Sequence, residues 1–124
     1  IGQLELIIKS IELKNNIVIK DPFDKALRKC LNFGHSIGHA VEAIMLNTQE
    51  PMLHGEAVVI GMIMESHVAL QKKLITKNIL SEIVSTLGSS FELRRLPVDL
   101  FERIPSLIKN DKKNSKSRRY RVRK

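Results

Sequence analysis

The sequence predicts an all-α domain, and three observations support that prediction. Apolar residues recur at intervals of three and four along most of the chain, which is the spacing of one face of a helix. Glycine, proline and N-capping residues divide these stretches into lengths typical of helices. Strand patterns are confined to residues 17–19 and the last few residues, so we expect a helical bundle.

The first half of the chain contains two predicted helices and a loop. Residues 2–15 have an amphipathic pattern, and Asp21-Pro22 marks the break that follows it. A long helix is predicted over residues 33–46, although it includes two glycines. Residues 47–53 are predicted to form the loop before the next helix.

The second half of the chain continues the helical pattern. Residues 55–73 are strongly apolar and predict a helix that contributes much of the core. Thr76 is a suitable N-cap for a further helix, which we expect Gly88 to end. Pro97 opens a last predicted helix that ends near Lys109.

Length and composition indicate one domain with a basic tail. Of the 124 residues, 43% are hydrophobic, which is enough for a core over residues 1–110, followed by a tail at 111–124. No apolar run approaches the roughly 20 residues of a membrane span, so we expect no membrane partner. The single Cys30 has no internal disulfide partner, which favours a reducing, cytoplasmic compartment. The chain opens in mid-pattern, so we expect a fragment of a longer protein.

The net charge of +8 is concentrated in the tail. Eight of the 21 basic residues follow Asp111 without any acid, and the remaining 13 bases balance the 13 acids. A basic tail can bind polyanions such as nucleic acid. Only one aromatic residue, Tyr120, lies in it to stack on bases, so we expect a solvated tail and no nucleic-acid partner.

Two histidines are spaced to share one face of a helix. His35 and His39 are four residues apart, so their imidazoles could hold a metal, or one could bind metal while the other handles protons. Gly34 and Gly38 beside them indicate that something approaches this helix closely. An ordinary helix–helix contact with structural histidines explains the same spacing, and the pattern leaves both interpretations open.

A third histidine stands where the loop enters the apolar helix. His54 could close a metal site against His35, or it could simply lie at an ordinary helix entrance. His67 has no polar companion motif, so we interpret it as structural or surface. Cations along the chain, including Lys14 and Arg28, suit a small anionic and hydroxylated substrate, although each alone is typical of a solvated surface.

Two long blocks of the sequence resemble the signature of the 3-dehydroquinate synthase family. The first runs from Arg28 to Glu42 and contains Leu-Asn-Phe-Gly-His-Ser-Ile-Gly-His-Ala-Val-Glu. The second runs from Leu53 to Met62 and begins Leu-His-Gly-Glu-Ala. Residues 111–114, Asp-Lys-Lys-Asn, resemble the late lysine motif of the family. The match is looser in three places: before the first block, in a longer loop between the blocks, and after residue 114.

The resemblance implies a two-domain lyase of the shikimate pathway of aromatic amino-acid and chorismate biosynthesis. In that family an N-terminal α/β domain binds NAD⁺ and an all-α C-terminal domain supplies most metal and substrate contacts. This chain resembles only the C-terminal domain, so we expect the isolated chain to be inactive. The reaction implied is the cyclisation of the sugar phosphate 3-deoxy-D-arabino-heptulosonate 7-phosphate to 3-dehydroquinate with loss of phosphate. A homodimer is expected for the intact enzyme.

The resemblance also implies roles for the three histidines. His35 and His54 correspond to two of three ligands of a Zn²⁺ or Co²⁺ ion, and the third is a glutamate expected upstream of this chain. His39 corresponds to a catalytic, substrate-side histidine.

The same resemblance assigns the substrate contacts. Lys14, with a catalytic role as well, and Arg28 correspond to partners of the substrate carboxylate and hydroxyls. Asn32 corresponds to a contact near the phosphate, and either Lys112 or Lys113 to a phosphate-binding lysine.

Two alternative functions fit the same residues. Another sugar-phosphate cyclase would share the fold and the metal site. A basic, non-catalytic binding module with structural histidines would not depend on zinc.

Overall fold

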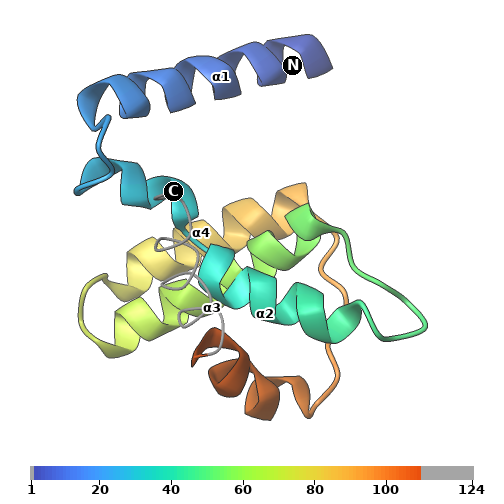
Figure 1. The fold of residues 1–124 in the computed structure, drawn as a ribbon. Helices are drawn as coiled ribbons and strands as arrows, with labels where there is room; N and C mark the ends of the chain where they lie inside the picture. Colours follow the sequence, from blue (N-terminus) through green and yellow to red (C-terminus); the bar gives the residue numbers. More distant parts are fainter. Residues whose placement is uncertain (1, 110–124) are drawn as a thin grey trace, which may run out of the picture. The chain divides into compact units, whose positions relative to one another are not determined.

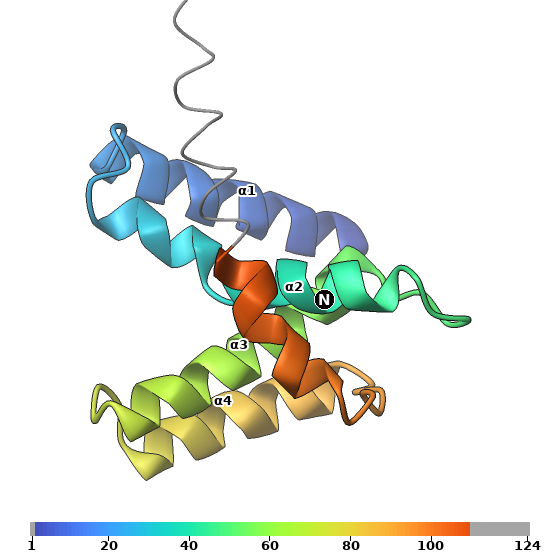
Figure 2. The same ribbon diagram turned by 60° about the horizontal axis from the view of Figure 1, so that its bottom comes forward.

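In the computed structural model, which describes residues 2–109, the chain is built from helices (Figures 1 and 2). The elements are α1 (Gln3–Lys20), the 3₁₀ helix η1 (Leu27–Asn32), α2 (His35–Met45), α3 (His54–Gln71) and α4 (Lys77–Ser90), and residues 100–109 are also helical. No strand occurs among residues 2–109, so the all-α prediction is confirmed for them. None of these helices is long and apolar enough to cross a bilayer.

The chain divides into two compact units, with the boundary between Phe33 and Gly34. In the first unit, the helix predicted over residues 2–15 continues to Lys20, so it includes residues 17–19, where the sequence has a strand pattern. The β-branched residues of that segment lower helix propensity by only tenths of a kcal/mol each. The backbone N–H of Asp21 still reaches the carbonyl of Ile17 at 3.0 Å, and the helix ends there because proline follows.

Asp21 organises the turn between α1 and η1. Its buried carboxylate accepts hydrogen bonds from the backbone N–H groups of Lys25 (2.9 Å), Ala26 (2.8 Å) and Arg28 (2.9 Å). These hydrogen bonds, of which that from Arg28 has the largest effect, lower the pKa of Asp21 below its ordinary value, because they stabilise the charged form of the carboxylate. The ionised carboxylate therefore holds the segment that leads into η1.

In the second unit, α2 crosses α3 at a contact made by three glycines. A Cβ on Gly38 would lie 2.9 Å from the Cα of Val58, and a Cβ on Gly61 would overlap the carbonyl oxygen of Gly34. Gly34 also has a φ of +80°, a left-handed conformation that side chains disfavour. The close approach expected at Gly34 and Gly38 is therefore made by α3, and this contact is compatible with either role of the neighbouring histidines.

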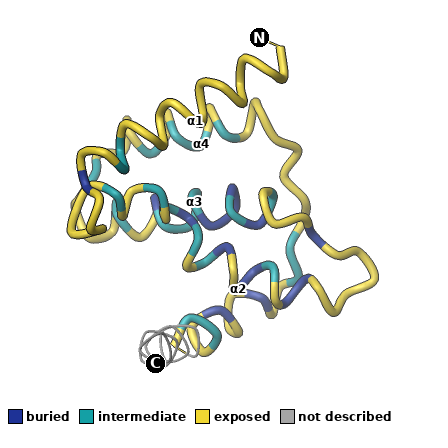
Figure 3. The backbone as a smooth tube through the Cα atoms, turned by 45° about the horizontal axis from the view of Figure 1, so that its top comes forward, coloured by how far each residue is buried: buried dark blue, intermediate teal, exposed yellow. Residues whose placement is uncertain are grey.

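The core of the second unit forms around this crossing. Val41 and Ile44 of α2 pack with Ala57 and Ile60 of α3, and Leu100 from the last described helix is fully buried among them. Figure 3 shows buried residues gathered on α2 and α3, whereas α4 has none. The core therefore fixes the two helices that carry the histidines.

The ends of the later helices test the capping predictions. The side-chain oxygen of Thr76 accepts a hydrogen bond from the N–H of Ile79 at 3.3 Å, which confirms the predicted N-cap of α4. The predicted stop at Gly88 is wrong, because α4 continues to Ser90. A glycine ends a helix by adopting a left-handed conformation, and Gly34 is the only glycine with positive φ in the part of the chain described.

Candidate metal centre

Three imidazoles lie together at the start of α2 and α3. The ring centroids of His35 and His39 are 5.7 Å apart, those of His35 and His54 5.7 Å, and those of His39 and His54 5.6 Å. His35 and His39 are one turn apart on α2, and His54 is the first residue of α3. The two residues predicted to be zinc ligands, and the predicted substrate-side histidine, are thus neighbours in space.

The spacing of the rings suits a small metal ion. Two imidazoles that each bind a tetrahedral zinc ion at about 2.0–2.1 Å have centroids about 5 Å apart, which is close to the 5.7 Å between His35 and His54. Nitrogen donors are also ligands that zinc prefers. Within residues 2–109, no three His, Cys, Asp or Glu side chains already stand in position around a common ion. Metal binding by His35 and His54 therefore stays a prediction.

The exposure of the cluster allows a ligand to approach it. His35 is half-buried, while His39 and His54 are exposed. Gly34 and Gly38 lie against α3, in the same two turns that carry His35 and His39. This part of the chain therefore combines close packing with accessible imidazoles. A metal ion or substrate could reach the rings without separating the helices.

Glu42 contacts His54, and sequence analysis gave it no role. Its Oε2 lies 2.9 Å from Nδ1 of His54. Glu42 is seven residues after His35, so two helical turns place it on the histidine face of α2. That spacing is the signal that could have identified it from sequence.

Glu65 of α3 holds the start of α2. Its Oε2 accepts a hydrogen bond from the backbone N–H of Gly34 at 2.9 Å, and its Oε1 lies 3.5 Å from that of Ile37. A carboxylate at a helix N-terminus satisfies N–H groups that have no partner within the helix and interacts favourably with the helix dipole. Because His35 is the first residue of α2, this contact fixes the backbone that carries its ring. No sequence pattern indicated it, since the two residues are 31 positions apart.

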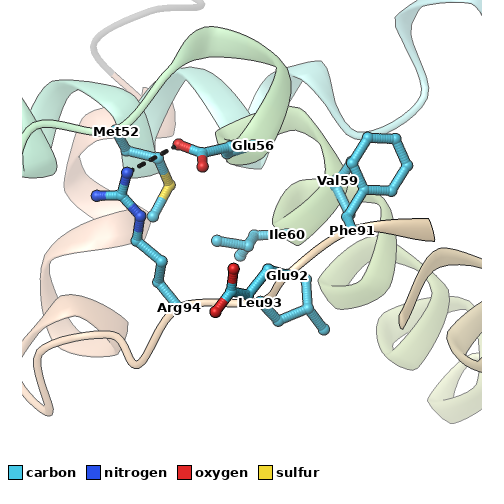
Figure 4. A pocket seen from close by; sticks show the side chains of 8 residues that line it. All are labelled: Met52, Glu56, Val59, Ile60, Phe91, Glu92, Leu93 and Arg94. Atoms are coloured by element: carbon cyan, nitrogen blue, oxygen red, sulfur yellow. Dashed lines mark ion pairs between the residues drawn. The ribbon is translucent and has the colours of Figure 1, made fainter. Parts of the chain in front are cut away.

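The start of α3 is fixed by a second set of polar contacts (Figure 4). The side chain of Glu56 accepts a hydrogen bond from the N–H of Leu53 at 2.9 Å. Arg94 reaches the same Glu56 oxygen at 3.4 Å and the carbonyl of Pro51 at 3.3 Å. These side chains line a cavity of about 10 Å³, roughly the space of one water molecule. The loop is thereby tied down on both sides of His54.

The other predicted site residues are distributed over the rest of the chain. Lys14 on α1, Arg28 and Asn32 lie in the first unit, and their approach to the histidines stays a prediction. Nη1 of Arg28 donates to the carbonyl of Pro22 at 3.4 Å. Lys112 and Lys113 lie outside the described residues, as does the rest of the predicted tail.

Two further residues have surface positions. His67 is exposed on α3, as expected of a structural or surface histidine. Cys30 is exposed and forms no disulfide in the described part of the chain.

Comparison with known proteins gives one consistent family. A family model described as 3-dehydroquinate synthase C-terminal matches residues 3–114. A 3-dehydroquinate synthase of Streptococcus equi subsp. equi is 38% identical over 117 residues, covering 90% of this chain and 31% of that protein. The enzyme of Streptococcus pyogenes serotype M18 is 38% identical over 120 residues (92% and 32%). That of Chlamydia pneumoniae is 36% identical over 106 residues (86% and 27%).

The chain spans about a third of the length of the curated relatives it matches. No solved structure matches it significantly. The matching family model is named for a C-terminal region, and all the predicted site residues lie within the matched residues 3–114. This chain belongs to the 3-dehydroquinate synthase C-terminal family.

Proposed function

We propose that this chain is the metal- and substrate-binding domain of a two-domain 3-dehydroquinate synthase. The complete enzyme would cyclise 3-deoxy-D-arabino-heptulosonate 7-phosphate to 3-dehydroquinate with loss of phosphate. The observation that carries the proposal is the proximity of His35 and His54, 5.7 Å between ring centroids, in a chain of this family. A cytoplasmic location and a homodimer of the intact enzyme are parts of the same proposal.

His35 and His54 would hold the metal ion, with a further ligand from a part of the enzyme outside this chain. Bound zinc would lower the pKa of a coordinated substrate hydroxyl, while NAD⁺ on the other domain would supply its reversible oxidation. An imidazole in its neutral form has one nitrogen lone pair to offer a metal ion, and the crossing of α2 and α3 fixes the backbone from which both rings project.

The remaining residues would bind and orient the substrate. His39 would contact a hydroxyl of a molecule bound at the metal and hold its proton, a role that its position one turn beyond His35 and 5.6 Å from His54 between ring centroids supports. Lys14 and Arg28 would pair with the carboxylate and Asn32 would bind near the phosphate. Lys112 or Lys113 would complete the phosphate contacts.

Zinc binding tests the proposal directly. His35→Ala and His54→Ala should each weaken zinc binding to the chain strongly, measured by competition with a chromophoric chelator. His67→Ala removes a histidine of the same helix as His54 but outside the cluster, and should leave the affinity unchanged. If both cluster variants bind zinc as tightly as the unaltered chain, the metal assignment is wrong and a non-catalytic module is favoured.

Turnover tests the reaction. The chain alone should convert no substrate even with NAD⁺ and zinc, because hydride transfer needs a nicotinamide held against the substrate. In the intact enzyme, His35→Ala should abolish formation of 3-dehydroquinate. An intact enzyme that instead cyclises a different sugar phosphate would favour the related-cyclase alternative.

A further inference from the structure

The contact between Glu42 and His54 joins a carboxylate to a predicted metal ligand. Oε2 of Glu42 lies 2.9 Å from Nδ1 of His54, a hydrogen-bond distance. Glu42 comes from the third turn of α2 and His54 from the first turn of α3, within one compact unit. The side chains are 34% and 51% exposed, so the pair borders the open side of the histidine cluster.

This contact determines which nitrogen of His54 carries the proton. A carboxylate only accepts hydrogen bonds, so Nδ1 must donate and must carry hydrogen. In a neutral imidazole the other nitrogen, Nε2, then has the lone pair. A metal ligand needs that lone pair, and a carboxylate behind the ring also makes the ligand more basic.

The same contact restricts the rotation of the ring. His54 is the first residue of an exposed helix start, where its side chain would otherwise sample several rotamers. Glu42 lies on the face of α2 that also carries His35 and His39, so the carboxylate draws the His54 ring towards the other two. A purely structural role is less consistent with the exposure, because polar contacts between half-exposed side chains contribute little to stability.

We propose that Glu42 is a positioning residue that fixes the tautomer and orientation of His54, so that Nε2 is offered to a divalent zinc ion. The inference rests on the proposed metal site at His35 and His54, and it adds a residue behind one of its ligands.

The test compares variants of the whole chain at constant pH. Glu42→Ala should weaken zinc binding about 10–100-fold, the usual cost of losing such a partner, by chelator competition. Glu42→Gln retains an oxygen acceptor and should fall between Glu42→Ala and the unaltered chain. Glu82→Ala, on an exposed position of α4, is the matched control and should change nothing. Circular dichroism should confirm equal helix content.

A readout without metal separates positioning from structure. Nitrogen-15 NMR of the metal-free chain should show His54 mainly as the Nδ1–H tautomer, and Glu42→Ala should shift it towards Nε2–H. Unchanged zinc affinity in Glu42→Ala, while His54→Ala loses it, would overturn this inference and leave the proposed metal site standing. A zinc affinity that neither His35→Ala nor His54→Ala changes would overturn the proposed metal site and the role of Glu42 together.

Discussion

Helices α1 and α3 have the same length, 18 residues, but differ completely in what they bury. α1 carries large aliphatic residues at helical spacing, and none of its residues is buried. α3 buries the small residues Ala57, Gly61 and Ser66 together with Val59 and Ile60. Small residues let the backbones of α2 and α3 meet, and the larger side chains around them then fill the core. Hydrophobic content alone therefore does not say which helix forms the rigid part of the domain.

The largest effect is expected where the backbones touch. Gly61→Ala would place a Cβ against the carbonyl of Gly34 and 2.7 Å from the N–H nitrogen of Gly38, so the helices would have to separate. We expect a loss of at least about 3 kcal/mol in the free energy of unfolding, measured by urea denaturation.

Gly88→Ala is the control for that substitution. It lies in α4 with open space at the Cβ position, and should stabilise the chain by about 0.5–1 kcal/mol. Equal effects of the two substitutions would contradict the tight α2–α3 crossing.

A smaller loss is expected from the carboxylate that joins the two helices. Glu65→Ala removes the acceptor of the buried Gly34 N–H and should cost about 1–3 kcal/mol in the free energy of unfolding. Zinc affinity should fall as well, because the start of α2 carries His35. Glu65→Gln keeps an acceptor oxygen and should lose less on both measurements. A Glu65→Ala chain with unaltered stability would show that water replaces the carboxylate.

In the first unit, the contribution of Asp21 to the stability of the fold is expected to depend on pH. The pKa of Asp21 is lowered in the folded chain, so its charge stabilises the fold fully above its ordinary pKa of about 4, and this is lost as the pH falls through the lowered value. Asp21→Asn should therefore lower the melting temperature near pH 7 and converge with the unaltered chain near pH 2. Asp24→Asn is the isosteric control in the same turn. A difference that grows towards acid pH would reverse the sign and refute the assignment.

The smallest effect is expected on α1. Ile11 is 61% exposed, so Ile11→Ala should change the free energy of unfolding by less than about 0.5 kcal/mol. Ile44→Ala, the same substitution at a position 2% exposed on α2, should cost about 2–5 kcal/mol. A large loss at Ile11 in thermal denaturation would show that α1 is buried in solution and would remove the contrast between the two helices.

The sequence predicted local features well and long-range ones poorly. Helical spacing located α3 within two residues at each end, and the Thr76 cap was correct, because both depend on residues close in the chain. The end of the first helix was predicted five residues too early, because the β-branched residues 17–19 lower helix propensity too little to stop a helix that is already formed.

For the candidate site, spacing put His35 and His39 on one face, the position of His54 at a helix entrance made it a candidate partner of His35, and the family resemblance gave each histidine a role. The contacts of Glu65 with Gly34, and of Arg94 with the loop before α3, join positions 31 and 43 residues apart. No local pattern contains such information, since it depends on how α2 and α3 cross.

The glycine crossing has a consequence for the entropy of ligand binding. Three positions without side chains lock α2 against α3, so the chain loses the backbone freedom between the two histidine-bearing turns when it folds. An ion arriving later would have to order only imidazole rotamers, while it gives up part of its hydration shell to the ligands. Small metal-dependent domains that are unfolded without metal must order their backbone as they bind it. In this chain the helix pair is already built, so zinc should alter the melting temperature more than the helix content.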